Sequence, residues 1–275
     1  RLEELFRITD RIFVMRDGET VGNLKTKEAN KDQLVNLMVG RQLGNYYSRS
    51  RHVVSGVSLE VKGLNHEKYF KDINFKAHYG EIVGFSGLVG ARRTEVMKTI
   101  FGAYSKKSGD VYLDGKKINI RSPRDAIEAG IVYVSEDRRE EGLILLNDVK
   151  FNMGLVNIKE YVKGVTVDHT KWSEMVESYR RKFSIRITSE NQQAGLLSGG
   201  NQQKVVLSKW LAKKPKVIIL DEPTRGIDVG SKSEIYAIID ELAAQGVSII
   251  MVSSELPEII NMCNRCYVMR EGTIT

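Results

Sequence analysis

The sequence predicts an α/β fold organised around a parallel β-sheet, and three observations carry that prediction. Residues 217–220 and 247–252 are apolar at nearly every position and rich in β-branched side chains, as in parallel strands that are buried on both faces. Each run follows a helical pattern, which ends at Pro215 in the first case and at Gly246 in the second. The third observation is a glycine loop at residues 86–94, which joins an apolar strand to another helical pattern.

The composition of the chain is compatible with several classes of binding partner and does not identify one of them. The 275 residues are 41% hydrophobic and 28% charged, which is ordinary for a globular protein with a sizeable core. The formal charge of +7 and the pI near 9.2 would suit nucleic acid, anionic lipid or nucleotide, but the basic residues are scattered among acidic ones. No apolar run approaches the roughly 18 residues of a membrane span, and the chain begins Arg1-Leu2-Glu3-Glu4, unlike a signal peptide. If the protein serves a membrane process, we expect another chain to cross the bilayer.

The two ends of the chain are similar to each other. Residues 2–21 align with residues 256–275 at a constant offset of 254, and seven of the twenty pairs are identical where chance gives roughly one. We therefore expect a piece of a tandem protein, in which residues 1–45 are the C-terminal tail of a preceding unit, 46–56 a linker, and 57–275 a second unit truncated at its C-terminus. The identical pairs are Leu2/Leu256, Glu4/Glu258, Arg11/Arg265, Val14/Val268, Met15/Met269, Arg16/Arg270 and Gly18/Gly272.

The cysteines Cys263 and Cys266 have the Cys-x-x-Cys spacing of redox sites and of half a zinc site. The first copy of the repeat has Thr9 and Ile12 at the matching positions, so the fold does not require thiols there. We therefore expect no metal or redox role for this pair.

Short strands follow the predicted linker. Residues 57–62, 73–78 and 81–85 alternate apolar with polar side chains, and the last run becomes fully apolar before the glycine loop. A turn at Asp114-Gly115 divides residues 110–120, and residues 131–134 form a further strand. Helical patterns are expected at residues 31–39, from the glycine loop through residue 101, within 148–196, including 171–183, and at 231–244.

The glycine loop has the spacing of a phosphate-binding P-loop. That pattern, G-x-x-x-x-G-K-[ST], uses glycine for close approach of the backbone to phosphate and lysine for the β- and γ-phosphates. Arg92 stands where the pattern has glycine and Arg93 where it has lysine, so the positive charge is kept but the backbone gains a side chain. Taken alone, a loop altered in this way is as often a purely structural loop as a phosphate-binding one. The candidate ATP-binding residues here are Gly87, Leu88, Val89, Gly90, Ala91, Arg92, Arg93 and Thr94, of which Thr94 is also a candidate metal ligand.

A second candidate anion site begins at Ser198. This residue can cap a helix, and Gly199 and Gly200 let a bound group approach the backbone, so the unpaired N–H groups and the positive end of the helix dipole could hold phosphate. Taken alone, such a turn is usually a plain loop.

Two carboxylates close the apolar run 217–220, at the edge where parallel sheets place their ligands. Asp221 is the candidate metal ligand, and Glu222 is the candidate catalytic residue that orients a water. An apolar strand that ends in Asp-Glu is, by itself, usually only a strand end.

Together, in this order and spacing, these segments resemble the P-loop, signature and Walker B sequences of ATP-binding cassette (ABC) proteins, and the resemblance spans residues 1–275. It implies a P-loop NTPase fold with a RecA-like parallel-sheet core, an antiparallel β subdomain and an α-helical subdomain at about 145–214. It implies ATP with Mg²⁺ as cofactors. Residues 198–202, called the signature turn below, would contribute Ser198, Gly199, Gly200, Asn201 and Gln202 to ATP binding.

The resemblance also gives roles to residues that carry little signal of their own. Glu136 stands where the family has a glutamine that senses metal and γ-phosphate, and Ser254 stands at the catalytic position of the switch histidine, whose charge a hydroxyl cannot carry. Residues 225–228 fit the D-loop, in which Asp228 is a candidate ATP-binding residue. Tyr69 is a candidate for stacking on adenine, although a plain surface or core tyrosine is the commoner case.

The departures from the family pattern are selective. The P-loop lysine and one glycine, the glutamine and the histidine are replaced, whereas the signature and Walker B residues are intact. Because phosphoryl transfer depends on positioning and charge neutralisation, such a cassette should hydrolyse its own nucleotide poorly. In ABC proteins two cassettes pack head to tail, with each ATP between the P-loop of one and the signature of the other. The hypothesis is that the signature turn completes the site of the first cassette of the same polypeptide, and that the glycine loop forms a weak regulatory site.

The motif combination resembles the second cassette of bacterial monosaccharide importers, of the galactose/methylgalactoside type first and the ribose type next. This implies a membrane permease dimer, a sugar-binding protein, no nucleic acid, and a peripheral position on the cytoplasmic face of the cell membrane. Two alternatives stay open: a soluble ABC ATPase acting on ribosome or DNA, and a nucleotide-binding regulatory module without hydrolysis.

Overall fold

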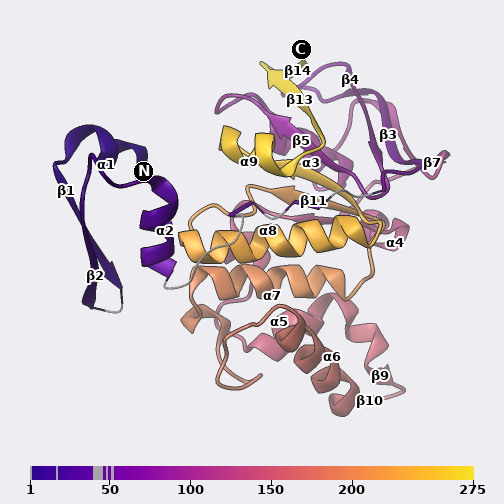
Figure 1. The fold of residues 1–275 in the computed structure, drawn as a ribbon. Helices are drawn as coiled ribbons and strands as arrows, with labels where there is room; N and C mark the ends of the chain where they lie inside the picture. The colour runs from indigo at the N-terminus through magenta and orange to yellow at the C-terminus, as the bar shows by residue number, and fades with distance from the viewer. Residues whose placement is uncertain (1, 17, 40–45, 48, 51–52) are drawn as a thin grey trace.

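A parallel sheet forms the centre of the molecule, as predicted. The computed structural model describes residues 2–16, 18–39, 46–47, 49–50 and 53–275 (Figure 1). Its six-stranded sheet has the order β14-β13-β5-β12-β11-β8, and all neighbours are parallel except the β13–β14 pair. Every residue of β11 and β12 is buried, which explains why all of them except Asp221 and Ser248 are apolar. The strands are β5 (Ile82–Ser86), β8 (Ile131–Val134), β11 (Val217–Asp221), β12 (Ser248–Val252), β13 (Arg265–Arg270) and β14 (Thr273–Ile274).

A second, antiparallel sheet lies beside the first and confirms the predicted β subdomain. Its order is β4-β3-β6-β7, and burial alternates along β4, so one face packs inward. Asp114 and Gly115 join β6 to β7 with φ of 52° and 72°, the left-handed pair that a two-residue hairpin turn requires. The strands are β3 (Val57–Asn65), β4 (Ile73–His78), β6 (Ser108–Leu113) and β7 (Lys116–Ile118).

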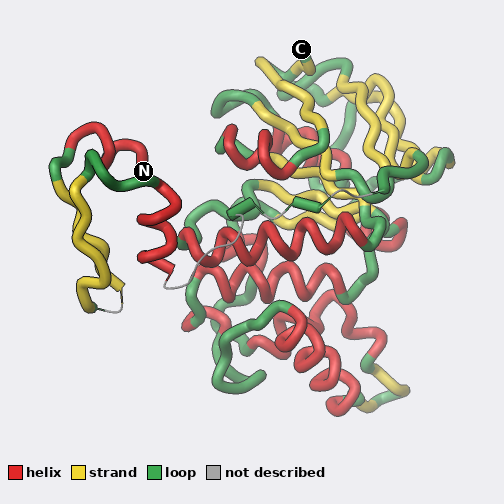
Figure 2. The backbone as a smooth tube through the Cα atoms, viewed as in Figure 1, coloured by secondary structure: helices red, strands yellow, loops and turns green. Residues whose placement is uncertain are grey.

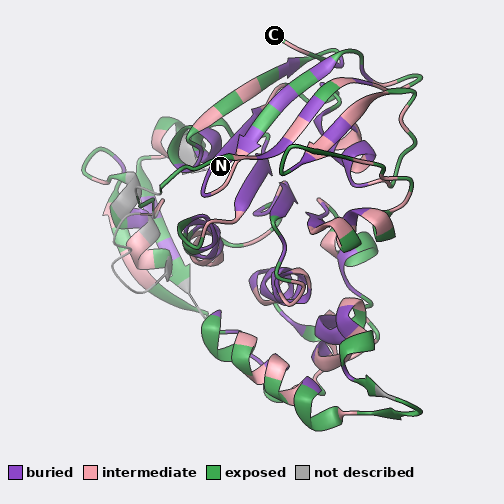
Figure 3. Ribbon diagram, turned by 90° about the vertical axis from the view of Figure 1, so that its right-hand side faces the viewer, coloured by how far each residue is buried: buried purple, intermediate pink, exposed green. Residues whose placement is uncertain are grey.

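Below the two sheets in the view of Figure 2 the molecule consists largely of helices, and Figure 3 shows buried and exposed residues on the same helices. In the helical region, α5 packs against both α6 and α7, and α7 also packs against α8. Between α5 and α6 the chain forms a short hairpin, β9–β10, which the sequence does not predict because two-residue strands leave no periodic signal. The helices are α3 (Arg93–Ile100), α4 (Pro123–Ala129), α5 (Val149–Gly154), α6 (His169–Lys182), α7 (Gly199–Leu211), α8 (Val229–Ala244) and α9 (Leu256–Met262), and the hairpin is β9 (Val162–Lys163) with β10 (Thr166–Val167).

The repeat found in the sequence is also a structural repeat. The chain begins with α1 (Leu2–Ile8), β1 (Arg11–Arg16) and β2 (Glu19–Lys25), followed by α2 (Lys31–Val39), which contacts α8. At the offset of 254, α1 coincides with α9 and β1 with β13, residue for residue. Both copies are therefore a helix followed by a hairpin.

The two copies differ in what covers them. Met262 and Met269 of the second copy are 0% and 1% exposed. Met262 lies on α9, which packs against β5, and Met269 lies on β13, which pairs with β5. Their counterparts Ile8 and Met15 in the first copy are 79% and 66% exposed, and within the described residues β1 pairs only with β2. The first copy thus presents to solvent the face that the second copy buries.

Part of the predicted linker packs on α8. The ring of Tyr47 lies 5.1 Å from that of Tyr236, and the Ser50 amide donates to Asp240 Oδ1 at 3.0 Å. Residues 40–45, 48 and 51–52 of the predicted tail and linker lie outside the described residues. Among the described residues, no helix has the length and apolar character needed to cross a bilayer.

Candidate functional site

The glycine loop runs from the end of β5 to the start of α3, as the sequence predicts. Gly87 has φ of 153°, and a Cβ there would lie 2.4 Å from the carbonyl oxygen of Met269, so only glycine fits. The Ala91 amide donates to the Leu88 carbonyl at 3.0 Å, which closes the loop. Leu88 and Val89 stand exposed at its tip.

Arg92 departs from the local rules for the start of a helix. It is the N-cap of α3 with φ of 74°, a left-handed conformation, and its side chain makes no capping hydrogen bond. Its guanidinium instead donates to Glu95 at 2.8 Å and lies over the Tyr69 ring, 5.3 Å from the centroid. Tyr69 also stacks on His66 at 4.5 Å. Arg92 and His66 thus both contact the Tyr69 ring, which was predicted to stack on adenine. That role of Tyr69 stays a prediction.

Arg93, which stands at the position of the P-loop lysine, points into the protein. The residue is 8% exposed, and its Nη1 donates to the Ser253 carbonyl at 2.6 Å. Its Nη2 lies 3.7 Å from Glu222 Oε1. Arg93 therefore neutralises Glu222, a carboxylate of its own chain.

Asp221 is the most deeply buried acid of the site. Its Oδ2 accepts from the Tyr133 hydroxyl at 2.7 Å, whereas Oδ1 has no hydrogen-bond partner among the described residues. Burial raises the pKa of Asp221 to about 6, against the opposing effect of the Tyr133 and Thr94 hydroxyls. A buried carboxylate oxygen without a partner, close to a hydroxyl, fits a hard cation such as Mg²⁺.

The structure brings Glu222 and Ser254, the two predicted catalytic residues, into contact, and their catalytic role stays a prediction. The Ser254 hydroxyl donates to Glu222 Oε2 at 3.1 Å, and the Glu222 amide donates to the Val252 carbonyl at 2.9 Å. Glu222 has φ of 47°, a strained conformation of the kind found at functional sites. Burial raises its pKa.

A cleft of about 420 Å³ lies between the start of α3 and the segment after β11. Glu136 is paired there with the guanidinium of Arg225, so the acid at the glutamine position is already neutralised. Lys98 and Glu141 form a second pair, at 2.7 Å. The lining residues are Thr94, Lys98, Tyr133, Glu136, Asp137, Arg138, Arg139, Glu141, Arg225 and Gly226.

The signature turn opens α7 at the surface. Ser198 is exposed, and its hydroxyl accepts from the Asn201 amide at 3.5 Å and from the Asn201 side chain at 3.1 Å. Close contacts with neighbouring side chains leave little room for a Cβ at either glycine. A Cβ on Gly200 would lie 2.2 Å from Ser231 Oγ, and one on Gly199 would lie 2.7 Å from Arg138 Nη2. Close packing within the chain is therefore a reason for glycine here, in addition to the approach of a ligand.

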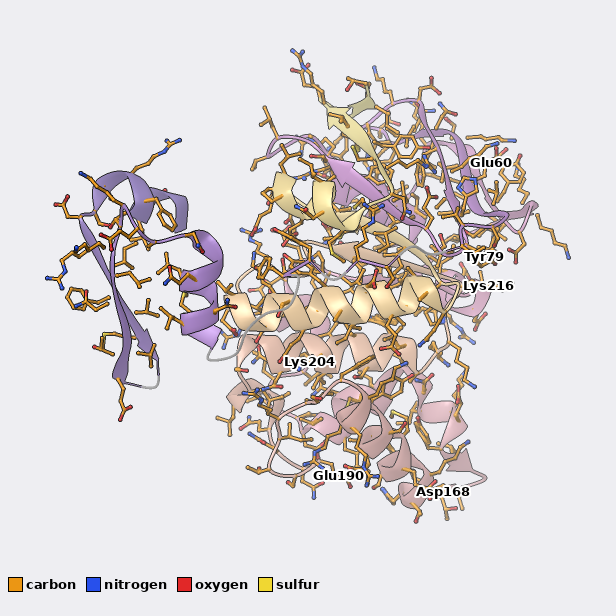
Figure 4. The ribbon with its side chains drawn as sticks, viewed as in Figure 1. Glu60, Tyr79, Asp168, Glu190, Lys204 and Lys216 are labelled. Carbon is orange, nitrogen blue, oxygen red and sulfur yellow. The ribbon has the colours of Figure 1, made fainter. Side chains whose placement is uncertain are left out.

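Ion pairing fixes the signature helix against its neighbour. Lys204 of α7 (labelled in Figure 4) is almost fully buried, and its ammonium pairs with Glu234 of α8 at 2.7 Å. Lys204 thus links the helix that begins at the signature turn to α8.

Two predicted ATP-binding residues support the turn from inside. Gln202 is buried, and its amide donates to the Ala194 carbonyl at 3.2 Å. Asp228 caps α8 by accepting from the Ser231 amide at 2.9 Å and from its hydroxyl at 2.7 Å. Contact of either residue with ATP stays a prediction.

Sequence reasoning missed Glu258 as a functional candidate. This buried carboxylate on α9 accepts from the Tyr236 hydroxyl at 2.5 Å, from the Ser253 hydroxyl at 2.6 Å and from the Thr224 hydroxyl. It thereby ties the segment after Glu222 to the segment that bonds Arg93. Its identity with Glu4 in the repeat was the signal available in the sequence.

The cysteines have separate environments. Cys263 is buried and Cys266 exposed, and neither is in a disulfide. Burial raises the pKa of the Cys263 thiol to about 12, which keeps it protonated and unreactive. No cluster of three or more His, Cys, Asp or Glu side chains suited to a metal occurs in the described part of the chain.

Comparison with protein families gives one match that covers most of this site. The family described as ABC transporter matches residues 70–225, which include the glycine loop, the signature turn and both carboxylates.

Curated relatives match along the whole chain. The ribose import ATP-binding protein RbsA of Clostridium tetani (strain Massachusetts / E88) is 46% identical over 276 residues, covering 100% of this chain and 55% of the relative. RbsA of Lactococcus lactis subsp. lactis (strain IL1403) is 48% identical over 274 residues, covering 100% and 56%. The chain spans about half the length of these relatives.

Solved structures share the fold. A nucleotide-free ATP-binding cassette from an ABC transporter superposes with a TM-score of 0.67 at 23% identity, covering 80% of this chain and 90% of that one. The dimeric cassette MJ0796 bound to ADP and Pi superposes with a TM-score of 0.67 at 20% identity, covering 78% and 96%. The chain therefore has the ABC cassette fold, with a mixed α/β sheet and a helical part.

Proposed function

The chain belongs to the ABC transporter family, and on that premise we propose that it is an ATP-binding part of a monosaccharide importer, which couples ATP hydrolysis to sugar uptake. The relatives that support the sugar class are named ribose import ATP-binding proteins. Of the two sugar types predicted from the sequence, ribose is therefore favoured over galactose or methylgalactoside. A permease dimer in the membrane and a sugar-binding protein would be its partners, with the chain peripheral on the cytoplasmic face.

The proposed domain organisation is the tail of a first cassette, a linker, and a second cassette. The exposure of Ile8 and Met15 supports it, because the matching residues of the second copy are buried beside β5. A strand like β5, supplied by the first cassette, would cover the same face of the first copy. Residues 1–45 would then complete the first cassette, and residues 57–275 would form the second.

The chain's own nucleotide site is proposed to be weak. Arg93 is engaged with Ser253 and Glu222, and Arg92 gives a side chain to a position where the P-loop has glycine. Thr94 and Asp221 would hold Mg²⁺, whose charge would neutralise the β- and γ-phosphates when it is bound with ATP. The inward Arg93 favours a regulatory rather than a hydrolytic role for this site.

The signature turn is proposed to complete the ATP site of the first cassette. The observation that carries this proposal is the contrast between an exposed, serine-capped helix start at Ser198 and a buried cation at Arg93. Exposed N–H groups at a helix start can stabilise phosphate in the transition state without reorganisation.

Two variants of the full-length protein, assembled with its permease, test this assignment. Ser198→Arg places a bulky side chain at the turn and should lower ATP turnover by about 100-fold, the cost of losing one transition-state donor. Arg93→Ala should leave turnover within about twofold, because its site contributes little hydrolysis. The assignment is wrong if Ser198→Arg leaves turnover untouched while Arg93→Ala abolishes it. Turnover measured with and without the first cassette distinguishes a transporter engine from a regulatory module, since only the engine depends on the partner.

A further inference from the structure

We propose that Arg138 is a positioning residue that fixes the signature turn against residues 225–226, so that the turn is held in place for the partner cassette's nucleotide. The proposal rests on the proposed function of the turn. Arg138 itself begins the π-helical turn Arg138–Gly142, in the segment that follows the strand β8 and the acid Glu136.

The guanidinium of Arg138 donates hydrogen bonds to two backbone carbonyls at once. Nη1 donates to the Arg225 carbonyl at 2.8 Å, and Nη2 donates to the Gly226 carbonyl at 3.0 Å. Gly226 has φ of 66°, a conformation that favours glycine. A planar guanidinium can make both bonds at once, and a lysine ammonium cannot match that geometry.

The third bond of Arg138 reaches the signature helix. Its Nε lies 3.4 Å from Gln202 Oε1, in the first turn of α7, and Gln202 is anchored from the other side by its bond to the Ala194 carbonyl. A Cβ on Gly199 would lie 2.7 Å from Arg138 Nη2 and 3.1 Å from the Gly226 carbonyl. The signature turn, Arg138 and residues 225–226 are therefore packed in direct contact.

The far side of this contact is anchored as well. The Arg225 side chain pairs with Glu136, which lines the chain's own cleft with Thr94. Arg138 thus connects the signature turn to a segment that is held by the chain's own nucleotide cleft.

A competing role for Arg138 is direct contact with nucleotide, since it lines the cleft together with Arg139. Arg139 is exposed and carries the same charge at the adjacent position, so Arg139→Ala is a matched control. A nucleotide-binding cation would affect KM for ATP, whereas a positioning residue would affect kcat.

The test uses the full-length protein with both cassettes and two readouts. Amide hydrogen exchange of residues 198–203, measured without nucleotide, should be about tenfold faster in Arg138→Ala and unchanged in Arg139→Ala. In ATP turnover, Arg138→Ala should lower kcat by about tenfold with KM within twofold. Arg138→Lys should recover less than half of either effect, because it keeps the charge and loses the two parallel bonds of the guanidinium.

Three results would overturn the proposal: exchange in Arg138→Ala equal to that in Arg139→Ala, a rise in KM with kcat unchanged, or full recovery by Arg138→Lys. If Arg138→Ala does not fold, Arg138→Lys alone decides the question. Wild-type hydrogen exchange and wild-type kcat in Arg138→Lys would contradict the proposal that the two parallel bonds of the guanidinium are needed. Failure of the proposed function is a separate outcome. In that case Ser198→Arg leaves turnover unchanged, while the exchange difference between Arg138→Ala and Arg139→Ala still reports the contact.

Discussion

The glycine loop and the signature turn have similar local designs and different tertiary surroundings. Each has glycines in the segment that leads into a helix or in its first turn, before α3 in one case and within α7 in the other. At α7 the cap residue Ser198 is exposed and bonds within its own turn. At α3 the cap residue Arg92 makes no capping bond, and Arg93 is turned toward Ser253 and Glu222.

The comparison shows that the tertiary surroundings decide whether the side chain at a helix start stays at the surface, as at Ser198, or is drawn into the protein, as at Arg93. The glycine loop carries more positive charge than the signature turn, yet its buried cation is used to neutralise Glu222. The signature turn has no such charge in its sequence, so the phosphate contacts predicted for it would come from backbone N–H groups. Four substitutions test how far the surroundings decide this difference.

The largest effect is expected at Glu258, which accepts from the hydroxyl of Ser253, the residue whose carbonyl bonds Arg93 of the glycine loop. Glu258→Ala leaves the hydroxyls of Thr224, Tyr236 and Ser253 without their acceptor, and should lower the free energy of unfolding by about 4 kcal/mol. The control is Glu255→Ala, which removes an exposed pair with Lys232 and should cost less than about 1 kcal/mol. Urea denaturation measures both, and equal losses would contradict the clamping role of Glu258.

The next effect concerns the pH dependence of Asp221. Burial raises its pKa from 3.8 to about 6. Between pH 3.8 and pH 6 the carboxyl group is therefore protonated in the folded state and ionised in the unfolded state. The ionised carboxylate therefore costs stability above pH 6, and this cost disappears below pH 4. Without Mg²⁺, Asp221→Asn should stabilise the protein by about 3 kcal/mol at pH 8 and by nearly nothing at pH 4.

The measurement is urea denaturation at both pH values with a chelator present. The same difference between Asp221→Asn and wild type at pH 4 and pH 8 would show that the carboxylate is not held in a desolvated site. The glycine loop would then be less enclosed than its contacts indicate.

On the signature side, Gly200→Ala should lower the free energy of unfolding by about 2 kcal/mol. The added methyl group would overlap Ser231 Oγ and Cβ, and this overlap outweighs the higher helix propensity of alanine. Gly56→Ala is the control, because a Cβ there meets no atom within 4 Å. Thermal unfolding compares the two, and a neutral Gly200→Ala would mean that the turn can move away from α8.

The smallest effect is expected at Arg92. Arg92→Gly removes a side chain from a left-handed residue and should raise the free energy of unfolding by about 1 kcal/mol. Arg92→Ala keeps the Cβ and should give no gain. Calorimetry distinguishes them, and an equal response of both variants would assign the effect to the Glu95 pair rather than to the backbone.

The sequence by itself determined the elements with strong local signals. The apolar runs at β8, β11 and β12 are buried on both faces, and the Asp114-Gly115 turn forms because its two residues tolerate positive φ. The repeat determined the matching elements of both chain ends, since α1 and α9 have the same register. These features depend on residues that are neighbours along the chain.

Only the tertiary structure decided where the charged side chains point. Arg93 bonds residue 253, Arg138 bonds residues 202, 225 and 226, and Glu258 accepts from residues 224, 236 and 253. The partners lie far apart in sequence or on other elements, so no periodicity or spacing could predict these contacts. A long, flexible cation can face solvent or protein, and the choice depends on which carbonyls and carboxylates the fold places within its reach.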